Sequence, residues 1–209
     1  MPSILITDCL QHDFVGPIDR FAGLPNALHV GHDESLRLLG PDPNQGPVAR
    51  MVAWAHQQSD DALKVIHVRD WHDPSDAHQS EHLEQFGHHC IGGSAGAEYV
   101  FSMQDIEDGK NVSIVNATTL TNFQDTDLGT HIQPFAQKAV RIGLMGVWTE
   151  AKITFLAYEL RARYPKFQLA VCSALTASPR ALRKKRRRAA FRFSTPPARW
   201  SPRFTTRAS

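Results

Sequence analysis

Five short apolar runs recur along the chain, at residues 3–7, 63–68, 112–115, 139–145 and 168–172. Runs of this kind and length are typical of parallel strands that are buried on both faces of a sheet. Between them, residues 48–58 and 150–164 place apolar side chains at three- and four-residue intervals, which is the period of a helix packed on a sheet. The alternation predicts a three-layer α/β/α sandwich with a central, mostly parallel, doubly wound sheet.

The periodic pattern ends after Leu175, and the rest of the chain is basic and rich in Arg and Pro. Residues 180–209 hold eleven of the 23 Lys and Arg residues and none of the 21 Asp and Glu residues, so the net charge of +2 hides an acidic body and a basic tail. We therefore expect one α/β domain at residues 1–178, followed by a tail at 179–209 that buries too little apolar surface to fold.

Three interpretations of this tail stay open. An α/β domain of this kind should continue into a last amphipathic helix, and none follows, so a shifted reading frame near Pro179 is the first interpretation. A solvated, disordered tail is the second. The basic run at residues 183–188 could bind nucleic acid through counterion release, but the acidic body repels phosphates, so we rank nucleic-acid binding last.

The remaining composition narrows the class of protein. No apolar run approaches the roughly 20 residues that a membrane helix needs, so we expect no membrane partner. The first apolar run lacks the preceding positive charges of a signal peptide. Three cysteines without CxxC spacing do not form a disulfide framework or a zinc knuckle. These features predict a soluble, cytoplasmic protein.

Polar side chains follow the predicted strands at the places where ligands bind in open parallel sheets. Asp8 follows the first strand, where a half-buried carboxylate can act as a general base or simply cap a loop. Asp70 follows the second strand, and several imidazoles come after it. One carboxylate with several imidazoles is a ligand set suited to Zn, Mn or Fe, although a histidine-rich surface loop would show the same spacing.

Two of these segments resemble the isochorismatase-like hydrolases, a family of cysteine hydrolases that includes the nicotinamidases. The pattern Asp-x-x-Gln-x-Asp-Phe at residues 8–14 is similar to the family's opening motif, in which the first Asp is the catalytic base. Residues 70–98 are similar to the nicotinamidase segment that binds one divalent metal ahead of a Gly-rich turn. The resemblance implies a catalytic Asp8 and a metal site at Asp70, His72, His78 and His89, with His82 and His88 as spare histidines.

The resemblance covers about 170 residues and departs from the family at two catalytic positions. The nucleophilic Cys of the family corresponds to Lys152, and a small residue near it corresponds to Trp148. The catalytic Lys of the family should fall near Asn116 or Ala117, where there is no lysine. Lys152 could attack a carbonyl if it were neutral, but we favour an ion pair with Asp8 across the crevice.

The thiols are poor substitutes for the missing nucleophile. Cys9 is expected to point away from Asp8, and we interpret Cys9, Cys90 and Cys172 as small buried hydrophobic residues. The resemblance implies a homo-oligomeric hydrolase of a small amide or related substrate, with a divalent metal and a pocket formed by Phe14, Trp148 and Asn116. We expect a metal-activated water to attack, with Asp8 as base. The alternative is a catalytically silent relative that binds a small ligand or a protein partner.

Overall fold

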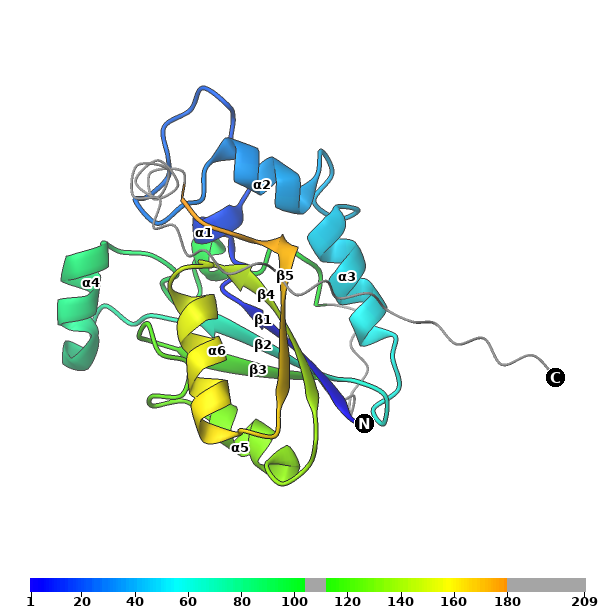
Figure 1. Ribbon diagram of the computed structural model, residues 1–209. Helices are drawn as coiled ribbons and strands as arrows, with labels where there is room; N and C mark the ends of the chain where they lie inside the picture. Colours follow the sequence, from blue (N-terminus) through cyan, green and yellow to red (C-terminus); the bar gives the residue numbers. More distant parts are fainter. Residues whose placement is uncertain (104–111, 180–209) are drawn as a thin grey trace, which may run out of the picture.

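The computed structural model describes residues 1–103 and 112–179, so the basic segment at 180–209 lies outside the described residues. A five-stranded sheet is formed by β1 (Ser3–Asp8), β2 (Lys64–Asp70), β3 (Val112–Ala117), β4 (Arg141–Val147) and β5 (Gln168–Ala177). All neighbouring strands are parallel, in the order β3-β2-β1-β4-β5 (Figure 1). The predicted strands are confirmed, and each extends further toward its carboxyl end than the apolar pattern indicates.

Helices cover the sheet and lie in the connections between its strands. They are α1 (His12–Val15), α2 (His32–Leu39), α3 (Pro47–His56), α4 (Ser80–Phe86), α5 (Leu128–Ile132) and α6 (Lys152–Arg163), with three 3₁₀ helices, η1 (Ala77–Gln79), η2 (Ala95–Ala97) and η3 (Gln133–Phe135). The two predicted helices correspond to α3 and α6. The other four α-helices are four to eight residues long, shorter than the window of about 11 residues over which a helical period is recognised. Within residues 1–103 and 112–179, no helix has the length and hydrophobicity of a membrane span.

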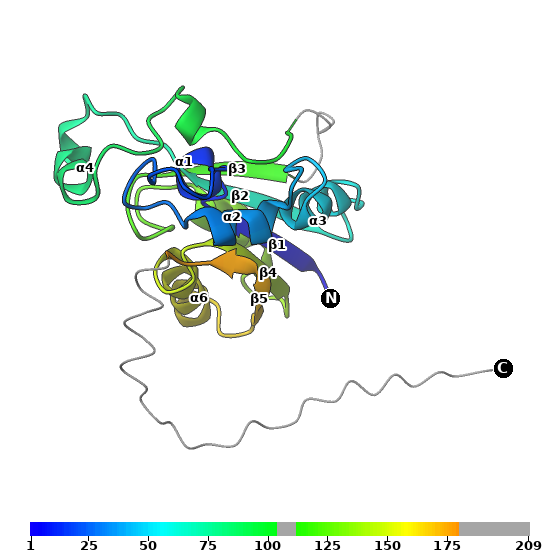
Figure 2. The same ribbon diagram turned by 90° about the horizontal axis from the view of Figure 1, so that it is seen from above.

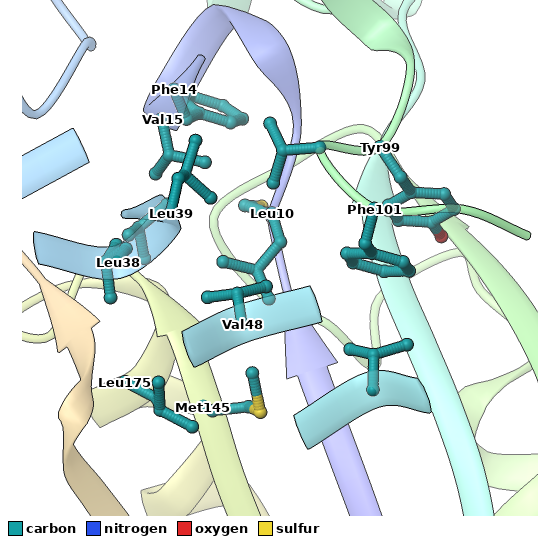
Figure 3. Packing of buried hydrophobic residues seen from close by; sticks show 14 of the residues in the cluster. Leu10, Phe14, Val15, Leu38, Leu39, Val48, Tyr99, Phe101, Met145 and Leu175 are labelled. Atoms are coloured by element: carbon teal, nitrogen blue, oxygen red, sulfur yellow. The ribbon is translucent and has the colours of Figure 1, made fainter. Parts of the chain in front are cut away.

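The central strands β1, β2 and β4 are buried on both faces, as a three-layer sandwich requires, while the edge strands β3 and β5 are partly exposed. Side chains alternate along β1, so Leu5 joins the hydrophobic cluster under α2 and α3 while Ile4 and Ile6 join the cluster that includes Leu156 of α6. Figure 3 shows part of the first cluster, in which side chains of α2 and α3 lie over β4 and β5. Figures 1 and 2 show α3 and α6 on opposite sides of the sheet. The predicted fold class is confirmed.

The strand order reverses between β1 and β4, and this places a crevice at their carboxyl ends. Gly146 of β4 is paired in register with Asp8 of β1. Its φ of +131° is unfavourable for other residues, and a Cβ atom here would lie 2.0 Å from the backbone oxygen of Asp8. Only glycine lets the two strands approach this closely beside the crevice.

A chain of hydrogen-bonded, buried polar side chains joins β1 and β2 to α3. The Thr7 hydroxyl lies 2.7 Å from Nδ1 of His67, and Nε2 of His67 lies 2.8 Å from Nε2 of His56. All three side chains are buried. Burial and then the neighbouring His56 lower the pKa of His67 to about 3, so this imidazole is neutral in the folded protein at neutral pH.

We expect mild acid to destabilise the fold through His67. In the unfolded chain its pKa returns to about 6.5, so below that pH the unfolded chain binds a proton that the folded chain does not. The free energy of unfolding should fall by about 2 kcal/mol between pH 7 and pH 5 from this group alone. Urea unfolding at pH 7 and pH 5 should show a clearly smaller loss in His67→Gln than in the wild type, whereas His88→Gln, at an exposed position, should keep the wild-type loss. Equal losses in the wild type and His67→Gln would contradict this account.

Candidate functional site

A cavity lies at the carboxyl ends of β1, β2 and β4. Its apolar wall includes Phe14, Leu28 and Trp148, and its polar wall includes Asp70, His89 and Lys152. The indole N–H of Trp148 donates to the backbone oxygen of Leu28 at 2.9 Å, which ties the loop before α2 to the start of α6. Phe14 and Trp148 therefore lie at the cavity, where sequence analysis predicted them.

Asn116 lies elsewhere, and its prediction as a pocket residue is wrong. It is on the exposed face of β3, where its side-chain oxygen accepts a hydrogen bond from Nε of Arg69 at 2.8 Å. The next residue, Ala117, takes the buried face because side chains alternate along a strand. A different amide, Asn122 in the loop after β3, is buried and donates to Oδ2 of Asp8 at 2.5 Å. In the sequence, Asn122 could have been recognised by its position in a polar loop that follows a predicted strand.

Asp8 is fully buried, and both of its carboxylate oxygens have partners. Oδ2 accepts from Asn122, and Oδ1 lies 3.2 Å from the donating thiol of Cys9. Burial raises the pKa of Asp8 to about 6, and the nearby positive charge of Lys152 limits the rise. Asp8 can therefore lose and regain a proton near neutral pH, as a general base must.

The expectation that Cys9 points away from Asp8 is wrong. Cys9 has a φ of +52°, so the regular alternation of strand side chains ends at this residue. Its sulfur lies between Oδ1 of Asp8 and Oδ1 of Asp70, at 3.2 and 3.6 Å, and it lines the cavity. Burial, followed by the charge of Asp70, raises the pKa of this thiol well above its ordinary value.

Lys152, the first residue of α6, forms a buried ion pair, but its partner is Asp70 and not the predicted Asp8. Burial disfavours both charges, yet Lys152 holds the pKa of Asp70 well below its ordinary value. Burial would likewise lower the pKa of the Lys152 amine, but Asp70 raises it above its usual range. Lys152 is therefore an ammonium ion, which has no lone pair for attack on a carbonyl.

Three imidazoles converge beside this ion pair. His72, His82 and His89 each offer a ring nitrogen, and these atoms all lie within 4.8 Å of one another. His82 on α4 takes the place that the family motif implied for His78. His78 is exposed on η1, where its backbone N–H donates to the capping Asp76. The sequence clue to His82 is Phe86, one helical turn later on the same face of α4. The two rings contact each other at the cavity, with their centroids 4.7 Å apart.

The hydrogen bonds of these rings leave lone pairs for a cation. Nδ1 of His72 lies 3.0 Å from the side-chain oxygen of Gln79, and Nδ1 of His89 lies 2.7 Å from the backbone oxygen of Gly87. Oxygen acceptors beside Nδ1 favour the tautomer that is protonated there, which leaves the Nε2 lone pair of each ring for a cation. Nε2 of His72 is buried and has no hydrogen-bond partner among the described residues.

The remaining groups of the cluster also suit a metal. Burial and the adjacent His72 lower the pKa of His82 to about 4, so this ring is neutral at neutral pH. Oδ2 of Asp70 lies 3.9 Å from Nε2 of His72 and 3.6 Å from Nε2 of His89. Neutral imidazoles whose second nitrogen is fixed by an oxygen acceptor are typical ligands of zinc and similar divalent metals, so the residues present fit such an ion.

The segment at residues 8–14 braces the whole site. The side-chain amide of Gln11 donates to the backbone oxygens of Asp70 and Ala97, at 2.6 and 2.9 Å, and its oxygen accepts from the backbone N–H of Asp70 at 2.8 Å. The carboxylate of Asp13 accepts from the backbone N–H of Cys90, the neighbour of His89, at 2.6 Å. The spacing of this motif therefore fixes the two loops that carry the cluster.

The same arrangement of strands and helices occurs in known structures. The nicotinamidase/pyrazinamidase of Bacillus subtilis is 21% identical with a TM-score of 0.66, and the alignment covers 93% of this chain and 96% of that one. This chain has the isochorismatase-like hydrolase fold. The isochorismatase-like hydrolase of Alkaliphilus metalliredigens gives 18% identity and a TM-score of 0.63, over 90% of each chain. The pyrazinamidase of Pyrococcus horikoshii in complex with zinc gives 18% and 0.61, over 88% and 90%.

No protein-family model and no curated protein matches the sequence. The isochorismatase-like fold is nevertheless the one that the segments at residues 8–14 and 70–98 implied, so that expectation is confirmed for the architecture.

We expect Gln11→Ala to be strongly destabilising in this isochorismatase-like fold. It would leave three backbone groups at the cavity unpaired, and each buried, unsatisfied group costs about 1–3 kcal/mol. Chemical unfolding should show a loss of about 3 kcal/mol or more. The control is Gln58→Ala, which removes one exposed hydrogen bond to Trp54 and should change stability by less than about 0.5 kcal/mol. A loss in Gln11→Ala no larger than in the control would show that the brace is not needed.

Proposed function

We propose that this chain is a metal-dependent hydrolase of a small amide or related substrate. The observation that supports this best is the convergence of His72, His82 and His89, with Asp70 beside them, at one end of an apolar cavity. A divalent metal held by the three imidazoles would polarise a carbonyl group and lower the pKa of a coordinated water. A zinc-containing pyrazinamidase with the same fold supports zinc as the first metal to test, ahead of manganese and iron.

The other cavity residues suit a small, flat substrate. The rings of Phe14 and Trp148 would contact its apolar body, and the ammonium group of Lys152 on the polar wall would attract a carbonyl or carboxylate oxygen. Asp8 would accept a proton from the attacking water and return it to the leaving nitrogen as the C–N bond breaks. Because Asp8 is buried behind Cys9, this proton would pass beside the Cys9 thiol, which donates to Asp8 and lines the cavity.

A second candidate function is a catalytically silent protein that binds a small ligand or a protein partner. The presence of a charged lysine at the start of α6, where the family has its thiol nucleophile, favours this candidate. Both candidates use the same metal cluster and cavity, so turnover is what separates them. A cytoplasmic location and assembly into homo-oligomers stay predictions.

Metal affinity should depend on His82 and not on His78. We expect His82→Ala to weaken zinc binding at least about tenfold, because it removes a ligand. His78→Ala, at an exposed position four residues earlier, should bind zinc like the wild type. Competition with a chromogenic chelator measures both variants. Stronger dependence on His78 than on His82 would contradict the proposed ligand set.

Activity should require both the metal and Asp8. We expect zinc-loaded protein to release ammonia from nicotinamide or another small amide, and Asp8→Asn to abolish this release. The carboxylate is the active form, so kcat/KM of the wild type should fall as the pH drops below about 6, the pKa of Asp8. Asp125→Asn, at an exposed loop position, is the matched control and should keep wild-type rates. Ligand binding without turnover across the amide panel would favour the silent protein instead.

A further inference from the structure

The carboxylate of Asp70 lies between two places for a positive charge. Its Oδ1 contacts the Lys152 ammonium, and its Oδ2 faces the ring nitrogens of His72 and His89 at 3.9 and 3.6 Å. Both members of the ion pair are inside the protein, with Asp70 2% and Lys152 4% exposed. A bound metal at the imidazoles and the ammonium would therefore share this carboxylate.

The other carboxylate near Lys152 is already engaged. Asp8 interacts with Lys152 electrostatically, but its oxygens accept hydrogen bonds from Cys9 and Asn122. A buried ammonium needs a counter-charge close by, because leaving it unpaired away from water is strongly unfavourable. Asp70 meets this need, so its negative charge is compensated before any metal binds.

We propose that Lys152 is a resident counter-cation that withholds the charge of Asp70 from the metal. The inference rests on the metal site of the proposed function and deepens it. The affinity of the site then comes mainly from the three imidazoles of His72, His82 and His89. Imidazoles suit zinc, whereas manganese depends more on carboxylate ligands, so Lys152 makes the site selective for zinc over manganese.

The test measures zinc and manganese affinities by chelator competition in variants of the full-length chain. In Lys152→Met the side chain stays unbranched, becomes one atom shorter and loses its charge. Asp70 is then freed, and manganese affinity should rise at least about tenfold, more than zinc affinity does. Lys152→Arg keeps the charge and should keep the wild-type selectivity. The double variant Asp70→Asn/Lys152→Met removes the pair without leaving a buried charge, and its zinc affinity should stay within about threefold of the wild type.

Two results would overturn the proposal. One is an unchanged ratio of zinc to manganese affinity in Lys152→Met. The other is a loss of zinc affinity in the double variant as large as that in His89→Ala, which would make Asp70 a full ligand despite Lys152. If Lys152→Met does not fold without metal, the double variant and Lys152→Arg decide the matter. Failure of the metal site itself is recognised separately, because wild type and His82→Ala would then both bind no zinc.

Discussion

The carboxylate of Asp70 is an ionised group inside the protein, and the candidate site is organised around its compensation. Its backbone is clamped by Gln11, one oxygen contacts Lys152, and the other faces two imidazoles. Removal of one partner from a buried ion pair typically costs about 3–5 kcal/mol, so Asp70 and Lys152 depend on each other. In the proposed metal site, the same charge would also set how strongly a metal binds.

The sheet brings these groups together from distant parts of the chain. Two of these groups, Asp8 and Asp70, are the last residues of β1 and β2, and the third, Lys152, begins the helix that follows β4. The reversal of strand order beside β1 places these strand ends around one crevice. Gly146 allows the close approach of β4 to β1, and the segment at residues 8–14 links the loops after β2 to the centre of the sheet. The fold therefore supplies the position of each group, while the chemistry depends on which side chain stands there.

The sequence was sufficient for the architecture because buried parallel strands are nearly continuous apolar runs, and α3 and α6 have a full helical period. The cluster was only partly predictable. The resemblance of residues 70–98 to the nicotinamidase segment implied Asp70, His72 and His89, but the choice of His82 over His78 depends on the direction of the short helix α4. The motif spacing alone does not contain that direction.

The other wrong predictions concern the orientation of Cys9, the partner of Lys152 and the place of Asn116. The orientation of Cys9 depends on one positive φ angle, which no pattern of residue types reveals. The partner of Lys152 is 82 residues away in sequence, and two carboxylates stood near enough to be candidates. Asn116 was placed by analogy with a family lysine, whereas strand alternation turns it outward and leaves Asn122 to bind Asp8.

The proposed metal site at His72, His82 and His89 is tested most directly by anomalous diffraction at the zinc edge from crystals of the zinc-loaded protein. The account predicts one strong peak about 2.0–2.1 Å from a ring nitrogen of each of His72, His82 and His89. A peak at another set of residues, or no peak at this cluster, would contradict it.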